Sequence, residues 1–451
     1  MKTEFTKRQL RDQNVQMAND IFRRCVHCGL CTATCSSYVI LGDERDSPRG
    51  RIYMIKEMLE SGAPPSEQLT THMDRCLTCL SCMTTCPSGV DYMHLSDLAR
   101  VEIEKRGNRS FIDRTIRGLL SSVLPYPHRF AFAMGLGRFA RPFAPLLKRM
   151  SALAPLGSML ELMPKRAKRA PEFKGGGVAS PKGHRYKRVV LMTGCAQQVI
   201  RPSINDASIR LMARQGIEVI VSSDTGCCGA LDLHMGHNDQ AVLHAKKNIE
   251  AFKSLDDDAP LDGIIMNASG CGTTVKDYGH LFATHKKYKG KTAFLDDAKR
   301  LSDKVFDISE FLIDYNFGPA QLWSDLKIGV HLPCSMKHGQ KINDQPFQLL
   351  RNAGFTVLPL EEDHICCGSA GVYNVLQPEI AASLGVRKAA HIATAKVDVV
   401  ATGNLGCLTQ LHHHTDTPVV HFVELLDWAY GGPCPEGLEA LRGRVERLKT
   451  D

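Results

Sequence analysis

Two short cysteine runs in the first hundred residues have the composition and spacing of metal ligands. The segments "CVHCGLCTATC" (25–35) and "CLTCLSCMTTCP" (76–87) both follow the pattern C-x2-C-x2-C-x3-C, which is typical of bacterial ferredoxins. Three thiolates at this spacing can wrap one face of a [4Fe–4S] cluster, whereas the fourth is poorly placed to close on it and reaches the other cluster. We therefore expect one cluster bound by Cys25, Cys28, Cys31 and Cys86, and a second bound by Cys76, Cys79, Cys82 and Cys35.

A pair of zinc knuckles is the alternative to this interpretation, because four thiolates also suit Zn²⁺. Zinc sites typically use two separated C-x2-C pairs, whereas here four cysteines fall within eleven residues, twice. The spacing therefore favours iron–sulfur clusters. The two runs differ after their last cysteine, where the first has Ser36 and the second has Pro87. This difference removes no ligand.

Two adjacent cysteine pairs, each followed by glycine, form a second pattern: "GCCGA" (226–230) and "CCGSAG" (366–371). A disulfide between neighbours would close a small strained ring, so adjacent thiols suit a soft metal ion or redox chemistry instead. The segments 188–279 and 326–411 share one order of apolar strand, cysteine, helix, strand, doublet, helix, strand and cysteine. The first cysteine precedes the doublet by 32 residues in both copies, and the last follows it by 43 and 40. We interpret this as a duplicated β-α-β unit.

The cysteines of each repeat follow predicted strands, at the edge of an α/β sheet where binding sites form. We expect each repeat to gather four thiols, Cys195, Cys227, Cys228 and Cys271 in the first and Cys334, Cys366, Cys367 and Cys407 in the second. They either hold a metal or redox centre in at least one repeat, which we favour, or are reduced and packed. The second repeat is the better candidate because the glycines of residues 368–371 leave room for a cluster. His27, His331 and His364 are candidates for hydrogen bonds to clusters, and Cys434 fits neither pattern.

The predicted fold class is α plus α/β: a helical ferredoxin-like N-terminal domain with two [4Fe–4S] clusters, followed by two duplicated α/β Cys-Cys-Gly domains. Between the cysteine runs, Pro48 and Gly50 are expected to form a turn. Apolar residues recur at roughly helical spacing from residue 52, so a helix is expected to follow the turn. Arg49 and Arg51 either offset cluster charge or are solvated at this turn. The expected division is a ferredoxin-type domain at 1–110, a helical connector and basic Gly/Pro linker at 111–187, a first repeat at 188–320, and a second repeat with a C-terminal helix at 321–451.

The connector carries six prolines between residues 125 and 164, which exclude one long helix. We expect short amphipathic helices that pack on the ferredoxin part, on a partner, or on a membrane surface. The following segment, 164–188, is basic and rich in glycine and proline, and predicts an exposed linker.

The bulk composition narrows the class of protein. The chain has 451 residues, 17 cysteines and a formal net charge of +8, and bound clusters of about −2 each would offset part of that charge. No secretory signal or membrane span is visible, so we expect a cytoplasmic protein with reduced thiols. A nucleic-acid partner is not expected, because the basic linker lacks interleaved aromatic residues. The "GLGRFA" segment lacks a β-α-β setting, and we assign no catalytic or organic-cofactor-binding residue.

Together the two patterns resemble one family, the iron–sulfur subunits of glycolate oxidase. The resemblance covers nearly the whole chain and is carried by "CVHCGLCTATC", "GDERDSPRGRIYMIKEMLE", "DRCLTCLSCMTTCPSGVDY", "TGCAQ", "ASGCGTTVKDYG" and "CCGSAGVYN". It implies a partner subunit that holds FAD and oxidises glycolate to glyoxylate, while this chain relays electrons towards quinone or another acceptor. It also implies that the isolated chain is not catalytic, and it allows a peripheral position on the cytoplasmic face of the inner membrane.

Related families leave alternatives open. The iron–sulfur subunits of lactate-utilisation and anaerobic glycerol-3-phosphate dehydrogenase complexes are similar, and so is the B subunit of heterodisulfide reductase. The last of these ends each repeat in C-x-x-C, whereas this chain has "CGTT" and "CLTQ". The missing cysteines count against a self-sufficient thiol–disulfide enzyme. A binding scaffold that holds zinc, or no metal, in the repeats is the remaining alternative.

Overall fold

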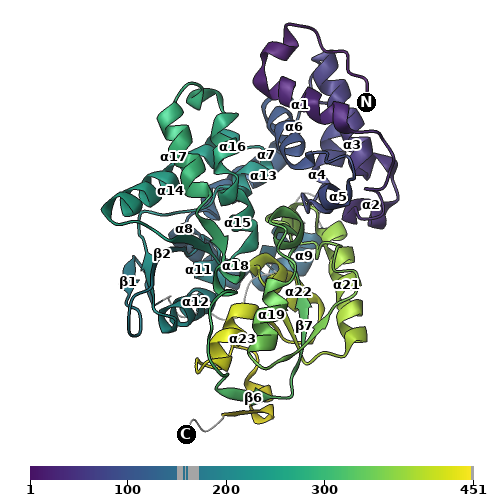
Figure 1. Cartoon of the computed structure of the whole chain (residues 1–451). Coiled ribbons are helices and arrows are strands. Elements are labelled where there is room, and N and C mark those ends of the chain that lie inside the picture. Colours follow the sequence, from purple (N-terminus) through teal and green to yellow (C-terminus); the bar gives the residue numbers. More distant parts are fainter. Residues whose placement is uncertain (150–155, 158, 161–171, 448–451) are drawn as a thin grey trace.

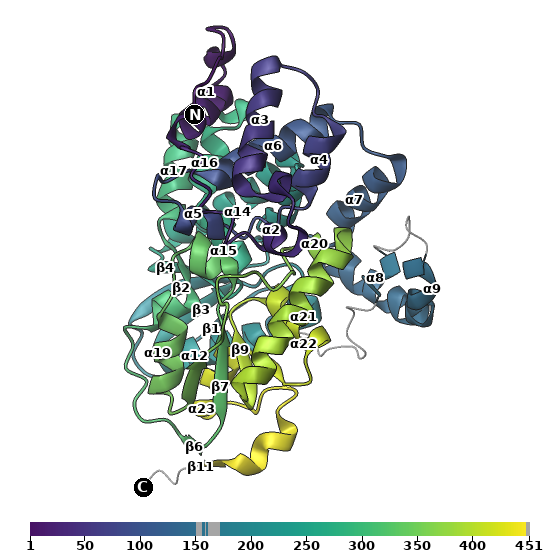
Figure 2. The same cartoon turned by 90° about the vertical axis from the view of Figure 1, so that its right-hand side faces the viewer.

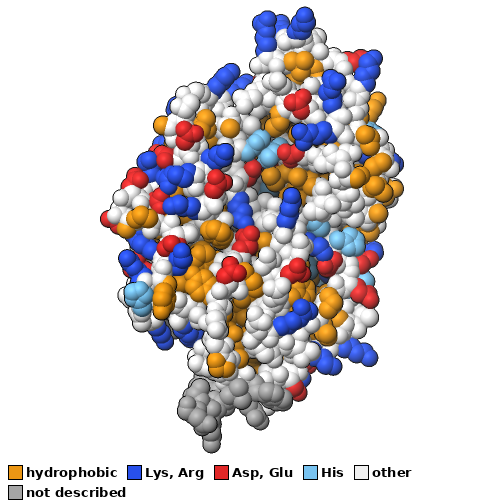
Figure 3. Space-filling view, viewed as in Figure 1, with side chains coloured by type: hydrophobic (Ala, Val, Ile, Leu, Met, Phe, Trp, Pro, Cys, Tyr) orange, Lys and Arg blue, Asp and Glu red, His pale blue; other side chains and the backbone are white. Residues whose placement is uncertain are grey.

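The computed structural model of the 451-residue chain describes residues 1–149, 156, 157, 159, 160 and 172–447 (Figure 1). A helical N-terminal part lies against two α/β units, and the second view shows a group of helices projecting to one side (Figure 2). On the face shown in Figure 3, basic and acidic side chains are interspersed. None of the helices within the described ranges is both long and apolar enough to cross a membrane.

The N-terminal part consists of short helices around one apolar core. Phe22, Ile55, Met73 and Leu95 are all buried in this core. Its elements are η1 (Gln9–Arg11), α1 (Gln13–Arg24), α2 (Ser36–Leu41), η2 (Glu44–Asp46), α3 (Pro48–Ser61), α4 (Glu67–Asp74), α5 (Ser81–Thr85) and α6 (Tyr92–Arg106). The first cysteine run lies in the loop between α1 and α2, and the second spans the loop after α4 and the short helix α5, which carries Cys82.

The helix between the cysteine runs begins earlier than the sequence pattern suggests. We expected a turn at Pro48 and Gly50, but α3 starts at Pro48, and the side chain of Ser47 caps it by accepting a hydrogen bond from the N–H of Gly50. Proline suits the first helical position because its fixed φ fits the helix and its missing N–H is not needed there. Gly50 allows close packing, since a Cβ there would lie 2.1 Å from the carbonyl oxygen of Glu44.

The first repeat is built on a five-stranded sheet in the order β1-β3-β2-β4-β5. All neighbouring strands are parallel except β1, which is antiparallel to β3. The strands are β1 (Gly177–Ala179), β2 (Lys187–Met192), β3 (Ile217–Val221), β4 (Gly263–Met266) and β5 (Val305–Asp307). The helices are α11 (Gln197–Ile200), α12 (Ser203–Arg214), α13 (Ala230–Met235), α14 (Asn238–Asp258), α15 (Ser269–Lys276), α16 (Tyr278–Ala283), η4 (Lys286–Tyr288), α17 (Thr292–Ser302) and α18 (Ile308–Leu312).

The second repeat has the same topology. Its parallel sheet runs β10-β9-β7-β8, which matches the order β5-β4-β2-β3 of the first repeat. The strands are β7 (Lys327–His331), β8 (Thr356–Pro359), β9 (Val399–Thr402) and β10 (Val419–His421). The helices are η5 (Ser335–Gly339, a π-helix), α19 (Gln345–Asn352), α20 (Tyr373–Leu376), α21 (Pro378–Ala395), α22 (Leu405–His414), α23 (Phe422–Ala429) and η6 (Glu439–Arg444). A separate antiparallel ribbon pairs β6 (Leu322–Ser324), which precedes the second sheet in the chain, with β11 (Val445–Arg447), which follows it.

The glycine after each doublet fixes how the two repeats correspond in space. Gly229 and Gly368 have φ of +85° and +94°, and a Cβ there would lie 2.8 Å from the carbonyl oxygen of Ala241 and 2.6 Å from that of Ala381. Each doublet therefore packs its glycine directly on the long helix that follows, α14 or α21, as the sequence predicts for a close backbone approach. Ala241 and Ala381 occupy equivalent positions, so residues at equal distances beyond them can be compared.

The two repeats share one hydrophobic core. Val189 and Ile265 of the first sheet and Ile328 and Val399 of the second belong to the same buried cluster. Arginines on α12 reinforce this junction by pairing with buried Asp427 of α23, with Arg210 at 2.6 Å. The repeats are therefore two halves of one packed body rather than independent modules.

The connector forms the projecting helices α7 (Phe111–Val123), α8 (Pro127–Ala140) and α9 (Ala144–Arg149), with η3 (Arg141–Phe143) between the last two (Figure 2). The inner residues Ile116 and Leu120 pack against Val372 and Val375 of the second repeat. The exposed linker expected over 164–188 is only partly described: its residues up to 171 lie outside the described ranges, and residues 177–179 form β1 at the edge of the first sheet. The C-terminal helix expected for the second repeat is α23, after which the chain turns into η6 and β11.

Candidate metal centres

The eight cysteines of the two N-terminal runs line two small cavities. Cys25, Cys28, Cys31 and Cys86 border the first, and Cys35, Cys76, Cys79 and Cys82 border the second, with Cys82 also reaching the first. Each cavity thus combines three cysteines of one run with the last cysteine of the other. All eight are free thiols. A set of four converging thiols is the donor set of a [4Fe–4S] cluster, so these residues fit such a group.

The two cysteine loops have matching and unusual backbone conformations. His27 and Thr78 each lie two residues after the first cysteine of their run and have φ of 57° and 49°. Gly29 and Leu80 lie two residues further on and have φ of 83° and 63°. Left-handed conformations cost about 1–2 kcal/mol for residues other than glycine. The strain at His27, Thr78 and Leu80 is typical of a loop held in shape for a function.

Burial keeps several of these thiols protonated in the absence of a positive partner. Desolvation raises the pKa of Cys31 to about 11, and it raises the pKa of Cys79 and Cys82 further. Burial also opposes ionisation of Cys76, but the guanidinium groups of Arg51 and Arg100 outweigh it and lower the pKa of that thiol. Thiols of this kind become ligands when a metal centre displaces their protons.

Arg51 is the buried cation beside the second cavity. Its guanidinium donates to the Sγ of Cys35 at 3.8 Å, to the carbonyl of His72 at 2.7 Å and to the carboxylate of Asp46 at 3.2 Å. Of the two interpretations open for Arg51, the structure supports charge compensation, because the side chain is 1% exposed. Arg49 is different: it pairs with Glu44 at 2.5 Å and donates to the backbone of His27.

Two further groups that sequence reasoning missed contact Cys76, a cysteine of the second cavity. The hydroxyl of Tyr92 donates to the Sγ of Cys76 at 3.6 Å, and Arg100 donates to the carbonyl of Cys76 at 2.8 Å. Both residues lie on α6, which the sequence does not mark as part of a site. Tyr92 and Arg100 reach Cys76 only through the packing of α6 against the cysteine loop, so no pattern in the neighbouring sequence could have identified them.

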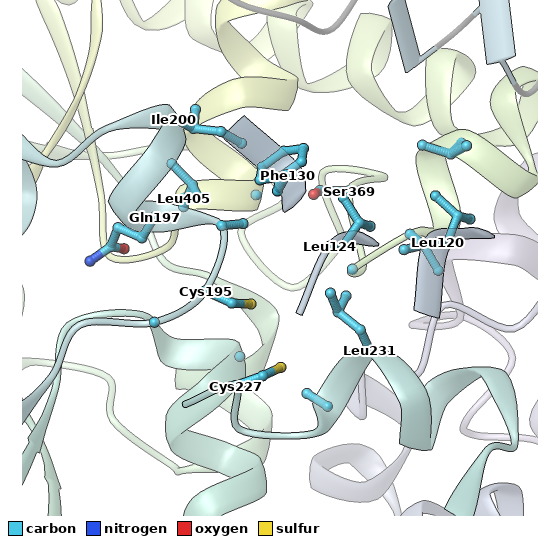
Figure 4. A pocket seen from close by; sticks show the side chains of 18 of the residues that line it. Leu120, Leu124, Phe130, Cys195, Gln197, Ile200, Cys227, Leu231, Ser369 and Leu405 are labelled. Atoms are coloured by element: carbon cyan, nitrogen blue, oxygen red, sulfur yellow. The ribbon is translucent and has the colours of Figure 1, made fainter. Parts of the chain in front are cut away.

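The four cysteines of the first repeat open onto a much larger cavity. Cys195, Cys227, Cys228 and Cys271 lie on one wall of a space of about 320 Å³. Figure 4 shows the sulfurs of Cys195 and Cys227 directed towards it from the ends of their strands. A hydrogen bond with the Cys227 thiol and burial raise the pKa of Cys195 well above the usual range. The same contact lowers the pKa of Cys227, but a hydrogen bond with Cys228 and burial outweigh it and raise that pKa as well. The repeat therefore presents at least the neutral thiols of Cys195 and Cys227 to this cavity.

The remaining walls of this cavity are mostly apolar and come from three parts of the chain. Leu120, Leu124 and Phe130 come from α7, α8 and the turn between them, and Leu231 comes from α13 (Figure 4). Ser369 and other residues of the second repeat close the opposite side. The cavity thus lies where the connector and both repeats meet.

The four cysteines of the second repeat lie against the N-terminal part instead. Cys366, Cys367 and Cys407 are buried in one cluster with Leu77 and Cys79 of the second cysteine run. The Sγ atoms of Cys334 and Cys366 are 3.8 Å apart. We expected the open space at the second repeat, but the large cavity lies at the first. The reason is that Leu77 and Cys79 of the N-terminal part cover the thiols of the second repeat, while Ser369 and Gly371 line the cavity of the first repeat.

Comparison with known proteins places these features in a family. The family described as "4Fe-4S dicluster domain" matches residues 24–90, and the family described as "Cysteine-rich domain" matches residues 189–276 and 328–412. The glycolate oxidase iron-sulfur subunit of Escherichia coli (strain K12) is 36% identical over 429 residues, which cover 95% of this chain and 99% of that protein. The chain belongs to the glycolate oxidase iron–sulfur subunit family.

Further comparisons agree with this assignment. A probable glycolate oxidase iron-sulfur subunit of Bacillus subtilis (strain 168) is 28% identical, covering 91% of this chain and 93% of that protein. A crystal structure of a hypothetical protein from Helicobacter pylori shares the fold, with a TM-score of 0.52, 9% identity, and coverage of 95% of this chain and 74% of that one. The predicted fold class, the duplicated repeat and the iron–sulfur cofactor are thereby confirmed.

As a member of the glycolate oxidase iron–sulfur subunit family, the chain is an iron–sulfur electron-transfer subunit of an oxidoreductase. Of the histidines singled out in the sequence, His27 lines the first cluster cavity. His331 lies beside the thiols of the second repeat. His364 is half-buried, two residues before the second doublet. Cys434 lines neither cluster cavity nor the large one, and its thiol donates to the carbonyl of Pro435.

Proposed function

We propose that this chain is the electron-transfer subunit of a glycolate-oxidising complex. In this proposal, flavin-containing partner subunits oxidise glycolate to glyoxylate, and this chain carries the electrons to quinone or another acceptor. The observation that carries the proposal is the match to glycolate oxidase iron-sulfur subunits over 95% of the chain. The match spans both the cluster loops and the two repeats. Lactate and glycerol 3-phosphate are the alternative substrates.

The ligands of the two clusters are proposed to be crossed between the cysteine runs. Cys25, Cys28, Cys31 and Cys86 would hold one cluster, and Cys76, Cys79, Cys82 and Cys35 the other, in support of which each set borders its own cavity. Clusters of this type, when bound, accept and release electrons singly. Within the chain, Arg51 balances negative charge beside Cys35 and Cys76, and Tyr92 donates to Cys76.

The arrangement of the repeats suggests where electrons leave the chain. The large cavity has mostly apolar walls and four thiols on one side, and both features suit an apolar, ring-shaped acceptor such as a quinone head group. A metal or redox centre at Cys195, Cys227, Cys228 and Cys271 would stand directly at this acceptor site. We therefore propose that the acceptor binds in this cavity and that the thiols of the first repeat hold the metal or redox centre that passes electrons to it.

The projecting connector helices support peripheral attachment to the cytoplasmic face of the inner membrane. Six large apolar side chains on α8, η3, α9 and the start of α7 are more than half exposed: Phe111, Phe132, Leu136, Phe139, Phe143 and Leu146. Exposed Arg114, Arg129 and Arg149 lie among them. Apolar side chains mixed with arginines bind at the interface of anionic membranes. The inner sides of α7 and α8 line the cavity, so an acceptor dissolved in the membrane would reach the cavity over a short distance.

Turnover of the reconstituted complex tests the proposed function. The purified chain alone should not reduce a soluble dye with glycolate, whereas the chain with its flavin subunits should. Replacing glycolate by lactate or glycerol 3-phosphate is the matched control for substrate. Robust glycolate oxidation by the flavin-free chain, or a complex that prefers lactate, would contradict the proposal.

A further inference from the structure

One group of buried donors at the second repeat is unlike anything at the first. A ring nitrogen of His331 and the Sγ atoms of Cys367 and Cys407 all lie within 4.8 Å of one another. The three residues are buried, and His331 is only 2% exposed. The Nε2 of His331 has no hydrogen-bond partner among the described residues. An unpartnered buried nitrogen that faces two thiols is a ligand site in both chemistry and geometry.

The histidine is specific to the second repeat. His331 is the last residue of β7 and pairs with Thr402, the last residue of β9. In the first repeat the same register pairs Met192, the last residue of β2, with Met266 of β4. A methionine packs in an apolar core without a partner, whereas a buried imidazole needs one. The exchange of methionine for histidine at this strand end therefore points to a ligand in the second repeat.

A buried lysine beneath the second doublet is a second, independent difference. Lys388 lies seven residues after Ala381, where the first repeat has Asn248 seven residues after Ala241. Asn248 is fully satisfied by Gly226, Cys227 and Tyr278. Lys388 is 2% exposed, and its ammonium donates to the carbonyl of Glu362.

The positive charge of Lys388 would be stabilised by metal-bound thiolates nearby. A buried ammonium is costly unless an opposite charge lies near. Burial lowers the pKa of Lys388, and ionised Cys367 or Cys366 would act in the opposite direction. A divalent ion with three thiolates and one neutral imidazole carries one net negative charge. Lys388 would balance that charge.

The spacing of the donors fits one ion rather than a cubane cluster. Two thiolates bound to a single tetrahedral ion at about 2.3 Å lie about 3.8 Å apart, and the donor atoms of His331, Cys367 and Cys407 all lie within 4.8 Å of one another. Thiolates at different corners of a cubane bind different irons and are held farther apart. Cys366 adjoins Cys367 in the chain and its thiol is in hydrogen-bond contact with that of Cys367, so it is the candidate for the fourth ligand. A tetrahedral set of sulfur and nitrogen donors is typical of zinc.

We propose that the second repeat binds one soft divalent transition-metal ion, with zinc the ion its donors suit best, through His331, Cys367, Cys407 and Cys366. On binding, the three thiols release their protons to solvent and the imidazole binds as a neutral ligand. The ion would hold the second repeat against the N-terminal part, because Cys366 and Cys367 pack beside Cys79. Redox chemistry would then belong to the two clusters and the first repeat.

The metal content of the full-length chain tests this site separately from the proposed function. We expect about one zinc per chain in addition to the iron of the two clusters, with X-ray absorption at the zinc edge showing three sulfur ligands and one imidazole nitrogen. The variant His331→Ala should lose that equivalent of zinc while its iron content and cluster signals stay the same. The matched control His364→Ala changes another histidine near the doublet and should keep the zinc.

Three results would overturn the site. They are zinc that remains in His331→Ala, a wild-type chain without zinc but with four extra irons, and zinc without an imidazole ligand in wild-type protein. The last measurement needs no variant and holds even if His331→Ala fails to fold. A complex that oxidises another substrate would leave the zinc result unchanged, so failure of the proposed function and failure of this site are distinguishable.

Discussion

The hydroxyl oxygen of Ser36 accepts a hydrogen bond from the backbone N–H of Cys366 at 3.0 Å. Ser36 follows the last cysteine of the first run, where the second run has Pro87, and it is fully buried. Its hydroxyl also lies 4.0 Å from the Sγ of Cys79. The departure from the ferredoxin pattern thus has a physical reason: proline has no side-chain acceptor, and here the acceptor joins the cluster loops to the doublet of the second repeat.

The crossed ligand assignment predicts which cluster each cysteine serves. The change Cys86→Ser should damage the cluster of Cys25, Cys28 and Cys31 and leave the other one. Cys35→Ser, its matched counterpart, should do the reverse. Iron content and the electron paramagnetic resonance signals of the reduced protein measure both. If Cys86→Ser left the first cluster intact and disturbed the second, the crossed assignment would be wrong.

Removing the buried cation beside Cys35 should make one cluster harder to reduce. Arg51 lies 3.8 Å from that sulfur, and losing its charge disfavours the more negative reduced state. For the variant Arg51→Gln we expect a fall in the reduction potential on the order of 100 mV, as one unit charge gives at an effective dielectric constant of about 20. A redox titration measures the potential. Arg51→Lys keeps a charge and should shift it less, and an unchanged potential in both would refute the role of Arg51.

Filling the large cavity should affect apolar acceptors selectively. Leu124 lines this cavity, so Leu124→Trp should reduce turnover of the complex with a quinone at least tenfold, while turnover with a small soluble dye should change little. Val386→Trp adds the same bulk at an exposed position of α21 and serves as the control. Equal loss with quinone and dye would mean that the cavity is not the acceptor site.

The connector helices should govern attachment to lipid. Phe139 and Phe143 are 84% and 61% exposed, and each apolar side chain inserted in a membrane adds about 1–3 kcal/mol. The double change Phe139→Ser and Phe143→Ser should therefore weaken co-sedimentation with anionic vesicles by tenfold or more. Tyr53→Ser, an exposed aromatic on α3, should not. Binding unaffected by the double change would instead favour a protein partner for this surface.

One histidine should make the junction between the N-terminal part and the first repeat sensitive to pH. Burial opposes protonation of His94 on α6, but hydrogen bonds with Asp277 and Asp91 outweigh burial and raise its pKa to about 10. Because the folded-state pKa is above the unfolded value of about 6.5, the stabilisation is complete below pH 6.5 and is lost as the pH rises towards 10. The difference in melting temperature between wild type and His94→Gln should shrink over that window. A difference independent of pH would show that His94 stays neutral.

The cysteine spacing carried most of the information that sequence could supply. The strand ends at Cys195 and Cys334 and the equal steps to the two doublets predicted the duplicated sheets, because strand and helix lengths are local properties. The two N-terminal sets and the set of the first repeat each line a common cavity, although their ligation stays a prediction. The start of α3 could also have been read, since Ser47 followed by Pro48 is a typical helix beginning.

Tertiary packing decided the rest. Nothing local distinguishes Arg51, which is buried against Asp46 and Cys35, from Arg49, which is half-exposed two residues earlier. The room expected at the second doublet is instead filled by Leu77 and Cys79 of the N-terminal part, and the large cavity forms where α7 and α8 cover the first repeat. His331 stood out only as a neighbour of cysteines, because the distance to Cys407 depends on two strands that are far apart in sequence.

The core shared by the two repeats has a consequence for how the chain is made. The first sheet is complete at Asp307, but the partners of its buried face, which include Val399 and α23, follow only about a hundred residues later. At roughly 5–20 residues per second on the ribosome, the finished first half waits on the order of 10 s with a hydrophobic face open to water. A chain interrupted in the second repeat would therefore expose this apolar face permanently and be prone to aggregate, rather than form a smaller working protein.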